Sequence, residues 1–277
     1  MTSSSLCFWK LQGAGNDFVL LDLLRQPLPM DDWAALARRL CDRRFGVGAD
    51  GVLLVESSER AAYRMRILNA DGSEASMCGN GIRCFAHYLW WHYALPNDVL
   101  AIETLAGVRH VHRVAQGRIT VEMGPPRTLD HPPTLPHEVQ SVLRRYTANA
   151  TASVAVLDTG APHLVLLVHH VEQFPLEVVG PVLEGYYPGR VNVSAAQVER
   201  GDCVRARVWE RGAGATLACG TGACAILVAG ARQGLLERRA TVQMPGGALQ
   251  VEWRDDDTLW LTGDAELVFE GVWHKPL

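Results

Sequence analysis

This 277-residue sequence lacks several features that mark other classes of protein. No apolar run approaches the ~20 residues that a membrane-spanning helix needs, and Met1–Leu11 has no basic segment followed by a long apolar one. Charge of one sign does not accumulate, because 26 basic and 30 acidic residues are spread along the chain and give a formal charge of −4. We therefore expect a cytoplasmic protein whose main partner is neither membrane nor nucleic acid.

The cysteines lack the spacing of a zinc site or of a disulfide framework. There are seven, an odd number, and no two form a Cys-x-x-Cys pair; they stand at positions 7, 41, 78, 84, 203, 219 and 224. Structural zinc sites commonly use close pairs, and disulfide frameworks use even numbers. We expect free thiols in a reducing compartment and no metal site.

The composition is typical of a globular protein with a proper core. Hydrophobic residues make up 48% and charged residues 20% of the chain. The length suits one large domain or two of ordinary size.

The strongest signal in the sequence is an internal repeat. Tyr63–Gly81 aligns without a gap with Val204–Gly222, at a constant offset of 141 positions. The matched positions are Arg64 with Arg205, Arg66 with Arg207, Ile67 with Val208, Cys78 with Cys219, Gly79 with Gly220 and Gly81 with Gly222. The repeat indicates two similar halves.

Each copy of the repeat predicts a strand, a loop, a cysteine and a helix in that order. Apolar residues alternate with arginines, which is the period of a half-buried strand. A loop of small residues follows, and then Cys-Gly-x-Gly leads into an Ala-rich apolar run, Ile82–Leu95 or Ala223–Leu236, long enough for a helix.

The rest of the chain predicts many short strands and few helices. Five prolines in Gly124–Glu138 indicate a boundary or hinge. One further helix is expected at Asp32–Arg43, with Trp33, Leu36, Ala37, Leu40 and Cys41 on one face. Short strands are expected at Val19–Asp22, Val52–Val55, Arg118–Met123, Leu164–Val168, Leu249–Trp253 and Leu259–Thr262. This pattern predicts an α+β protein made of two similar lobes.

A cysteine just before a helix is suited to acid/base chemistry. Unpaired backbone N–H groups and the helix dipole favour negative charge there, and so favour the thiolate. The N–H groups of Gly79, Asn80, Gly220 and Thr221 are also candidates to hold a carboxylate. If the two Cys-Gly-x-Gly turns face each other, one sulfur lies on each side of an amino-acid α-carbon. Proton removal on one face and delivery on the other would invert that carbon without pyridoxal phosphate or metal.

Simpler interpretations apply to most of the other motifs. A free cysteine is usually a small core residue, and we expect this of Cys7, Cys41 and Cys203 and of Cys84 and Cys224 inside the predicted helices. A redox dithiol would require the fold to bring distant cysteines together.

Two further motifs are also given structural interpretations, and one histidine is singled out as a candidate site residue. Gly13–Asp17 predicts a tight turn that presents Asn16 rather than a nucleotide loop. Trp90–Tyr93 predicts a packing face of a helix. Among ten histidines, only His163 is singled out as a candidate site residue, because it lies between a turn and an apolar strand.

With these motifs the chain resembles diaminopimelate epimerases nearly end to end. The matching segments are Gly13–Phe18, Asp42–Asp50, Asn69–Glu74, Met77–Cys84, Gly189–Val193, Glu210–Gly214, Ala218–Ala225 and Pro245–Gly247. The resemblance implies two mirror-like lobes, each a curved, mostly antiparallel sheet around a central helix. It implies an N-terminal lobe of residues 1–124 joined by 268–277, a C-terminal lobe of residues 125–267, and an active site in the cleft between them.

The resemblance also implies an activity and a set of site residues. The activity is conversion of LL-diaminopimelate to the meso form for lysine and peptidoglycan synthesis, without a cofactor and usually by a homodimer. Cys78 and Cys219 would be the acid/base pair, with His163 and Glu210 tuning their ionisation. Residues implied to bind substrate are Asn16, Asn69, Gly79, Asn80, Asn192, Glu210, Arg211, Gly220 and Thr221. Arg211 suits the distal carboxylate because its guanidinium can form two parallel hydrogen bonds.

Three positions depart from the commonest family pattern. Gly51 stands where some members have glutamine, Ala161 where many have asparagine, and Ala215 where glutamate often occurs. The first two changes remove polar contacts from the distal pocket. Two alternatives follow: a related racemase of another amino acid such as histidine, and a non-catalytic pair of binding lobes that retains the fold.

Overall fold

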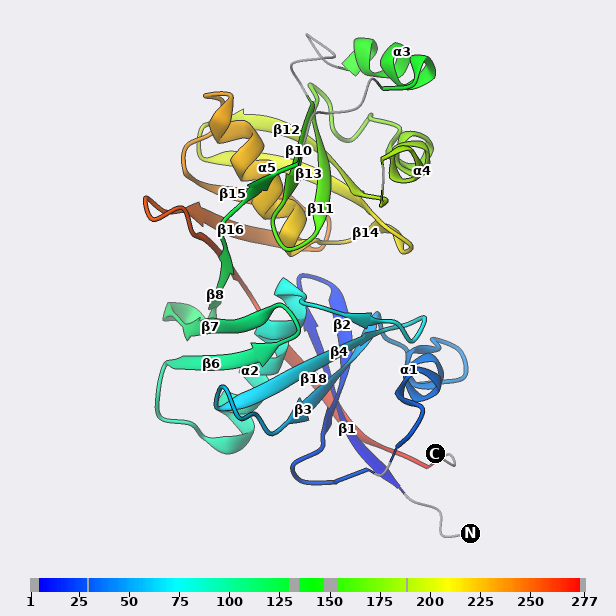
Figure 1. Ribbon diagram of the computed structural model, residues 1–277, viewed down its shortest axis with the longest axis vertical. Coiled ribbons are helices and arrows are strands. Elements are labelled where there is room, and N and C mark those ends of the chain that lie inside the picture. The colour runs from blue at the N-terminus through cyan, green and yellow to red at the C-terminus, as the bar shows by residue number, and fades with distance from the viewer. Residues whose placement is uncertain (1–4, 29, 130–134, 147–153, 188, 275–277) are drawn as a thin grey trace. The chain divides into compact units, whose positions relative to one another are not determined.

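The computed structural model describes residues 5–28, 30–129, 135–146, 154–187 and 189–274, and the chain divides into two compact units. Unit 1 comprises Met1–Val121 and Gly263–Leu277, and unit 2 comprises Glu122–Thr262 (Figure 1). The chain therefore leaves unit 1 shortly before the proline-rich segment. Part of that segment, residues 130–134, lies outside the described residues.

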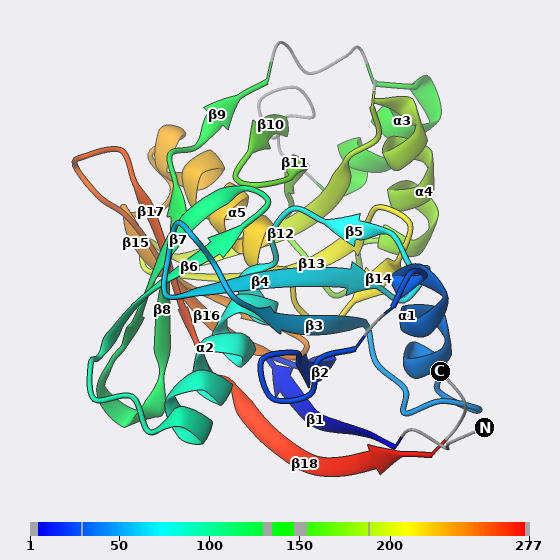
Figure 2. The ribbon, with the colours of Figure 1, turned by 60° about the horizontal axis from the view of Figure 1, so that its bottom comes forward.

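Unit 1 contains most of the first half of the chain and the last strand. Its elements are β1 (Leu6–Gly13), β2 (Asn16–Asp22), α1 (Trp33–Cys41), β3 (Gly51–Glu56), β4 (Tyr63–Asn69), β5 (Glu74–Ala75), α2 (Gly79–Tyr93), β6 (Val99–Thr104), β7 (Gly107–Arg113), the 3-10 turn η1 (Ala115–Gly117), β8 (Ile119–Gly124), which crosses the boundary, and β18 (Glu266–Trp273). Figure 2 shows β18, β1, β2, β3 and β4 side by side.

Unit 2 repeats most of this series of elements and adds helix α3. It contains β9 (Arg127–Thr128), α3 (His137–Tyr146), β10 (Val154–Asp158), β11 (Pro162–Leu167), α4 (Leu176–Tyr186), β12 (Asn192–Arg200), β13 (Cys203–Glu210), β14 (Gly214–Thr216), α5 (Gly220–Arg232), β15 (Arg239–Met244), β16 (Gly247–Trp253) and β17 (Leu259–Gly263).

The strands of the two units are paired in the same way. In unit 1, β1 and β2 are antiparallel, α1 leads to β3 parallel to β2, and β4 is antiparallel to β3. In unit 2, β10, β11, α4, β12 and β13 follow the same path. The register repeats too, because Val52 faces Leu68 in unit 1 and Val193 faces Trp209 in unit 2. The α+β class expected from the sequence is confirmed, and both units contain mostly antiparallel pairs.

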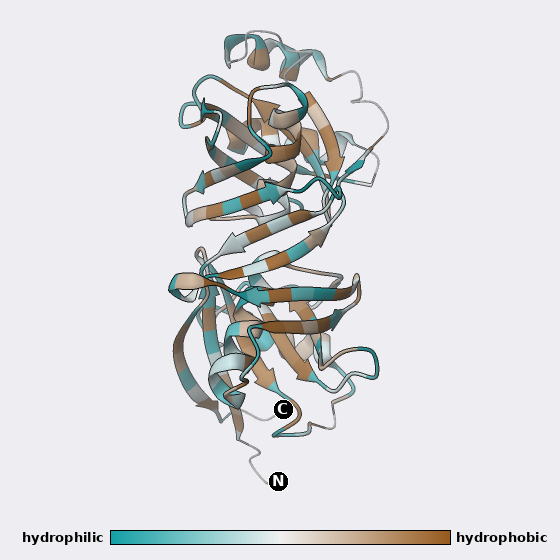
Figure 3. Ribbon diagram, turned by 90° about the vertical axis from the view of Figure 1, so that its left-hand side faces the viewer, coloured by the Kyte–Doolittle hydropathy of each residue, from teal (hydrophilic) through white to brown (hydrophobic). Residues whose placement is uncertain are grey.

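Each unit wraps its sheet around one apolar helix. Helix α2 contacts strands β1, β2, β3, β4, β7 and β18, and all residues from 79 to 86 are buried. Helix α5 contacts β10, β11, β12, β15 and β16, with Gly222–Gly230 buried. A helix that is apolar all round is stable only inside a core. Some strands around the helices, such as β13 and β15, alternate buried and more exposed residues, and Figure 3 shows such alternation as bands of colour. Strands β2, β3 and β11 are instead buried along most of their length.

A second, smaller core lies on the other side of each sheet. In unit 1, α1 packs on β3 and β4 through Leu36, Ala37, Leu40 and Cys41, so the expected apolar face is confirmed. Asp32 caps this helix by accepting a hydrogen bond from the Ala35 N–H. In unit 2, α4 packs on β12, β13 and β14 in the same way.

Several boundaries and elements differ from the sequence expectations. Helices α2 and α5 begin at Gly79 and Gly220, three residues before the expected Ile82 and Ala223, because each preceding cysteine is the N-cap residue itself. The short expected strands all lie within or overlap observed ones, whereas α3, α4 and the long strands β1, β12 and β18 were not predicted. Cys7, expected in the core, is exposed.

Candidate active site

Cys78 caps the central helix of unit 1. Its backbone is extended, with φ −142° and ψ 120°, and its Sγ accepts a hydrogen bond from the Gly81 N–H at 3.4 Å. The side chain is half-buried. The sulfur therefore lies where backbone donors and the helix dipole favour negative charge.

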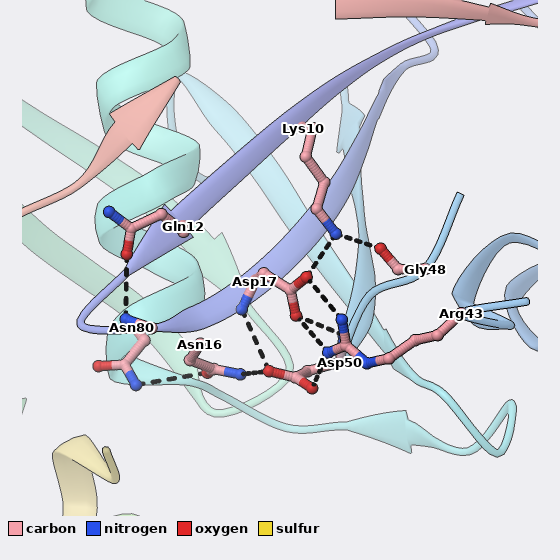
Figure 4. A network of polar contacts seen from close by, with 9 residues as sticks. Lys10, Gln12, Asn16, Asp17, Arg43, Gly48, Asp50 and Asn80 are labelled. Atoms are coloured by element: carbon pink, nitrogen blue, oxygen red, sulfur yellow. Dashed lines mark hydrogen bonds and ion pairs between the residues drawn. The ribbon is translucent and has the colours of Figure 1, made fainter. Parts of the chain in front are cut away.

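A polar chain connects Cys78 to neighbouring asparagines. The Oδ1 atom of Asn16 lies 3.8 Å from Cys78 Sγ and accepts a hydrogen bond from Asn80 Nδ2 at 3.3 Å. The Nδ2 atom of Asn16 donates to Asp50 Oδ2 at 2.7 Å (Figure 4). The structure thus brings together three of the site residues that the sequence predicted, Asn16, Cys78 and Asn80. Asp50, which holds Asn16, was not among them.

Asn16 is presented by a tight turn, as expected. Gly13 and Asn16 pair at the end of the β1–β2 hairpin, and the two residues between them have positive φ, 53° at Ala14 and 79° at Gly15. A two-residue loop with both φ angles positive matches the twist of a hairpin.

Charged residues behind the hairpin keep Asn16 and Asp50 in place. Arg43 bridges the carboxylates of Asp17 and Asp50, and buried Lys10 pairs with Asp17 and donates to the Gly48 carbonyl (Figure 4). Burial acts to raise the pKa of Asp17, but the hydrogen bonds from Arg43 and Lys10 outweigh it and lower the pKa to about 2. Asp17 is therefore charged at neutral pH.

Cys219 caps the central helix of unit 2. Its backbone is also extended, with φ −129° and ψ 113°, and only 5% of the residue is exposed. Its Sγ lies 3.4 Å from Thr221 Oγ1 and 3.9 Å from Nε2 of His163. His163 is fully buried, and burial lowers the pKa of its imidazole to about 3. The ring is therefore neutral at physiological pH.

The neighbours of His163 determine which ring nitrogen carries the hydrogen. The backbone N–H of Arg211 donates to Asn192 Oδ1 at 2.8 Å, which leaves Asn192 Nδ2 to donate to His163 Nε2 at 3.3 Å. Nε2 is thus the acceptor, and Nδ1 donates to Ser194 Oγ at 3.2 Å. The Thr221 hydroxyl, at 2.9 Å, is closer to Nε2 than Cys219 Sγ is, and Thr221 Oγ1 also lies 3.4 Å from that sulfur.

The second glycine of Cys-Gly-x-Gly leaves room for the cysteine in both units. A Cβ at Gly81 would lie 3.4 Å from Cys78 Cβ and 3.3 Å from the ends of two core side chains. A Cβ at Gly222 would lie 3.3 Å from Cys219 Cβ and 3.2 Å from the His163 ring. These contacts are tighter than most Cβ contacts, so the repeated glycine is explained by close packing.

The loop that carries Arg211 is held by α4. Glu184, 6% exposed, accepts from Trp209 Nε1 at 2.8 Å and from the Gly212 N–H at 3.1 Å, and pairs with Arg190. Burial acts to raise the pKa of Glu184, but the hydrogen bond from Trp209 and the other contacts lower it overall. Glu184 is therefore charged and fixes this loop.

Two predicted site residues have other contacts within their loops. Asn69, at the exposed end of β4, donates from Nδ2 to Ser73 Oγ at 2.9 Å. Glu210, at the end of β13, accepts from Thr216 Oγ1 at 2.6 Å. Cys78 and the residues around it belong to unit 1, and Cys219 and its neighbours belong to unit 2.

The sequence reasoning missed the residues that support the predicted ones. Ser194 contacts His163, and Thr159 donates to the Thr221 carbonyl. Asp50 accepts a hydrogen bond from Asn16. Arg83 is fully buried beneath the first turn of α2. Its only sequence signal was a charge inside an otherwise apolar helical run.

Most of the structural interpretations of other motifs are confirmed. Cys84 and Cys224 are fully buried in α2 and α5. Trp90 packs inward, although Trp91 is 52% exposed and Tyr93 donates to buried Asp22, so the expected packing face is only partly correct.

One departure from the family pattern has a structural explanation. Gly51 pairs with Asn69, and a Cβ at Gly51 would lie 2.8 Å from the Leu68 carbonyl oxygen. A side chain there would require a backbone shift, because a carbonyl cannot give way as a flexible side chain can.

Comparisons with known proteins agree on one family. The model of the family described as diaminopimelate epimerase matches residues 8–129 and 155–268. A diaminopimelate epimerase of Heliobacterium modesticaldum is 41% identical over 275 residues, covering 95% of this chain and 98% of that protein. A diaminopimelate epimerase of Nostoc punctiforme is 44% identical over 274 residues, covering 95% and 98%.

A solved structure extends the similarity at the level of the fold. The phenazine biosynthesis protein of the PhzF family from Bacillus anthracis superimposes with a TM-score of 0.74 at 17% identity, covering 98% of this chain and 99% of that one. No helix in the described part of the chain could span a membrane. The family match and the near full-length relatives show that the chain belongs to the diaminopimelate epimerase family, a family of isomerases.

Proposed function

We propose that this chain interconverts LL-2,6-diaminopimelate and meso-diaminopimelate without a cofactor, with Cys78 and Cys219 as the acid/base pair. The observation that carries the proposal is the repeated capping of a buried helix by a cysteine, on the same topology in both units. Packing alone explains a buried cysteine, but not two helix-capping cysteines at equivalent positions. The names of the 41–44% identical relatives supply the substrate.

The proposed reaction inverts one α-carbon. The α-carbon of the substrate is proposed to lie with one of the two sulfurs on each of its faces. The thiolate takes the α-hydrogen as a proton, and the C–H electron pair remains on a carbanion conjugated with the carboxylate. The thiol on the other face delivers its proton to the carbon, so the two sulfurs exchange protonation states and the configuration inverts.

The helix starts supply stabilisation for the developing charge. The substrate carboxylate is proposed to lie against Gly79 and Asn80 of α2 and Gly220 and Thr221 of α5. Negative charge on its oxygens increases in the transition state, and preorganised donors stabilise that charge without reorganisation.

The remaining predicted residues are assigned to tuning and recognition. His163 and Glu210 are proposed to tune the ionisation of the cysteines, which the 3.9 Å approach of His163 Nε2 to Cys219 Sγ supports. Asn16, Asn69, Asn192 and Arg211 are proposed to bind the rest of the substrate.

Isotope exchange tests the two-thiol reaction. The chain is incubated with LL- or meso-diaminopimelate in deuterium oxide, without added cofactor, and label at the α-carbon is followed. Inversion with incorporation of deuterium is expected. Cys78→Ser and Cys219→Ser should each reduce epimerisation severely, because a hydroxyl is a much weaker acid and base near neutral pH. Near-normal inversion by either variant would remove that sulfur from the mechanism.

Arg211 tests the identity of the substrate. Loss of a two-bond guanidinium–carboxylate contact costs about 2 kcal/mol or more, so Arg211→Ala should lower kcat/KM for diaminopimelate at least about 30-fold. Arg200→Ala, which removes an exposed arginine from the same unit, is the matched control and should retain activity. Equal activity of the two variants would show that Arg211 does not bind the distal carboxylate.

We also propose that the chain forms a homodimer through strand β18. Figure 2 shows β18 at the outer edge of unit 1, beyond β1. Val268, Phe269 and Val272 on this strand are 54%, 47% and 46% exposed, and an apolar edge strand is a common site of pairing between chains. Phe269→Glu should shift the sedimenting species to monomer. A monomeric parent chain, or a dimer unaffected by this change, would refute the assignment.

A reducing cytoplasmic location is proposed on chemical grounds. The mechanism needs both thiols reduced, and all seven cysteines are free.

A further inference from the structure

Arg83 is a buried charge with no role in the mechanism above. It is 0% exposed, and its guanidinium donates to the Gly79 carbonyl at 3.0 Å, to Asn80 Oδ1 at 3.0 Å and to the Asp264 carbonyl at 3.2 Å. Within the described residues no carboxylate forms an ion pair with it. Burying a charge without an opposite charge is costly, so its three acceptors must be held firmly in place.

Arg83 and Asp50 fix the direction of the polar chain that reaches Cys78. A guanidinium can only donate, so Asn80 must turn its Oδ1 toward Arg83 and its Nδ2 toward Asn16. A carboxylate can only accept, so Asn16 must turn its Nδ2 toward Asp50 and its Oδ1 toward Asn80 and Cys78. The donor at one end and the acceptor at the other therefore leave both amides a single orientation.

The charge also acts on the sulfur. Burial lowers the pKa of Arg83, and the ionised forms of Cys84, Cys78 and Asp264 would act in the opposite direction. By reciprocity, the guanidinium charge favours the thiolate of Cys78. Burial raises the pKa of Cys84 to about 12, so that neighbour remains a thiol.

Other charged groups around Arg83 partly cancel one another. Asp264, before β18, pairs with Arg118, before β8, at 3.5 Å. The two carboxylates of Asp17 and Asp50 are matched by the two cations of Arg43 and Lys10. These pairs leave Arg83 as the net positive charge beneath the first turn of α2.

The equivalent position in unit 2 has no charge. At the offset of 141 positions, Arg83 corresponds to Cys224, which is fully buried in α5. Cys219 instead lies beside the neutral imidazole of His163 and the Thr221 hydroxyl, and neither adds positive charge that would favour its thiolate. The two sulfurs of the duplicated motif therefore differ in the charge that lies nearby: a buried guanidinium for Cys78 and a neutral imidazole for Cys219.

We propose that Arg83 is a positioning residue of the Cys78 half of the site: it orients Asn80 and Asn16 and supplies positive charge behind the helix start, which makes Cys78 the thiolate and Cys219 the thiol of the free enzyme. This inference rests on the proposed two-thiol function but assigns Arg83 a role outside the predicted site.

The test measures alkylation of each cysteine by iodoacetamide as a function of pH, resolved by peptide mass spectrometry. Cys78 is followed in a Cys219→Ala background and Cys219 in a Cys78→Ala background. The pH midpoint is compared rather than the rate, because burial alters access to the sulfur. Cys78 should have the lower midpoint, and equal or reversed midpoints would overturn the proposal without any variant at Arg83.

Variants at Arg83 then separate charge from orientation. Arg83→Met should raise the Cys78 midpoint by about one pH unit, an approximately tenfold slower reaction at pH 7, and leave the Cys219 midpoint unchanged. Arg83→Lys keeps the positive charge but cannot donate to all three acceptors at once. The pH midpoint of Cys78 should therefore stay close to that of the parent chain. In a chain that retains both cysteines, the same substitution should raise KM. Arg60→Gln, which removes an exposed arginine of unit 1 with one 3.8 Å ion pair, should change neither.

Arg83 would have only a structural role if the folded Arg83→Met variant left the Cys78 midpoint unchanged. The same conclusion would follow if both midpoints shifted equally. Alkylation requires no turnover. Failure here with intact isotope exchange would therefore leave the proposed function standing, and loss of exchange in the parent chain would reject that function separately.

Discussion

At the scale of single residues, seven thiols of one chain have very different surroundings. Burial raises the pKa of Cys41 and of Cys84 to about 12, whereas Cys7 is exposed. Because the thiolate is the reactive species, surroundings rather than residue type decide which cysteines react.

Selective alkylation of the native chain follows from these surroundings. At pH 8, iodoacetamide should modify Cys7 within minutes and leave Cys41 and Cys84 unmodified until the chain unfolds. Peptide mass spectrometry before and after denaturation measures this. Comparable modification of Cys41 and Cys7 in the folded chain would contradict the burial of Cys41.

His163 links the stability of unit 2 to pH. Its pKa is about 3 in the folded chain, below the unfolded value of about 6.5, so the unfolded chain binds the extra proton between these values. The stability it contributes is complete above pH 6.5 and is lost as pH falls toward 3. Lowering the pH from 7 to 5 should therefore cost about 2 kcal/mol through this residue.

Urea unfolding of His163→Gln at pH 7 and pH 5 tests this linkage. The variant should lose less unfolding free energy between the two pH values than the parent chain, by about 2 kcal/mol. His170→Gln, which replaces an exposed histidine of the same unit, should behave like the parent. An identical pH dependence in all three chains would mean that folding does not lower the pKa of His163.

At the scale of elements, α4 packs so closely on β13 that one glycine is required. A Cβ at Gly180 would lie 2.6 Å from Trp209, whose Nε1 is fixed by Glu184. Gly185 in the same helix has no atom within 4 Å of the equivalent point. Close packing therefore requires glycine at position 180 but leaves room for a larger residue at position 185.

Alanine substitution in α4 distinguishes the two positions. Gly180→Ala should destabilise unit 2 by about 1–3 kcal/mol, because the indole ring must move in a well-packed core. Gly185→Ala should be neutral or stabilise by up to about 1 kcal/mol, since alanine has the higher helix propensity. Thermal unfolding compares them, and a stabilising Gly180→Ala would show that Trp209 is free to shift.

At the scale of the whole molecule, the proposed reaction needs one ionised sulfur from one unit and one protonated sulfur from the other. The activity should therefore depend on two titrations at once. We predict a bell-shaped dependence of kcat/KM on pH that belongs to the coupled pair of cysteines rather than to either one. Initial rates with diaminopimelate between about pH 6 and pH 10 test this, and a flat profile would exclude the thiol–thiolate requirement.

The sequence by itself determined the repeated unit, the α+β class and the identity of the two capping cysteines. Alternation, an Ala-rich apolar run and the pair Cys-Gly-x-Gly are local patterns, and local patterns survive in the sequence because backbone geometry imposes them.

The tertiary structure decided what surrounds each sulfur. Asp50, Ser194 and Glu184 reach the site residues through strand register and side-chain packing, which no local pattern encodes. The two copies therefore look alike in sequence, yet the helix that Cys78 caps contains buried Arg83, whereas Cys219 lies beside the neutral ring of His163. Burial and neighbouring charge thus depend on the tertiary structure as well as on the repeated motif.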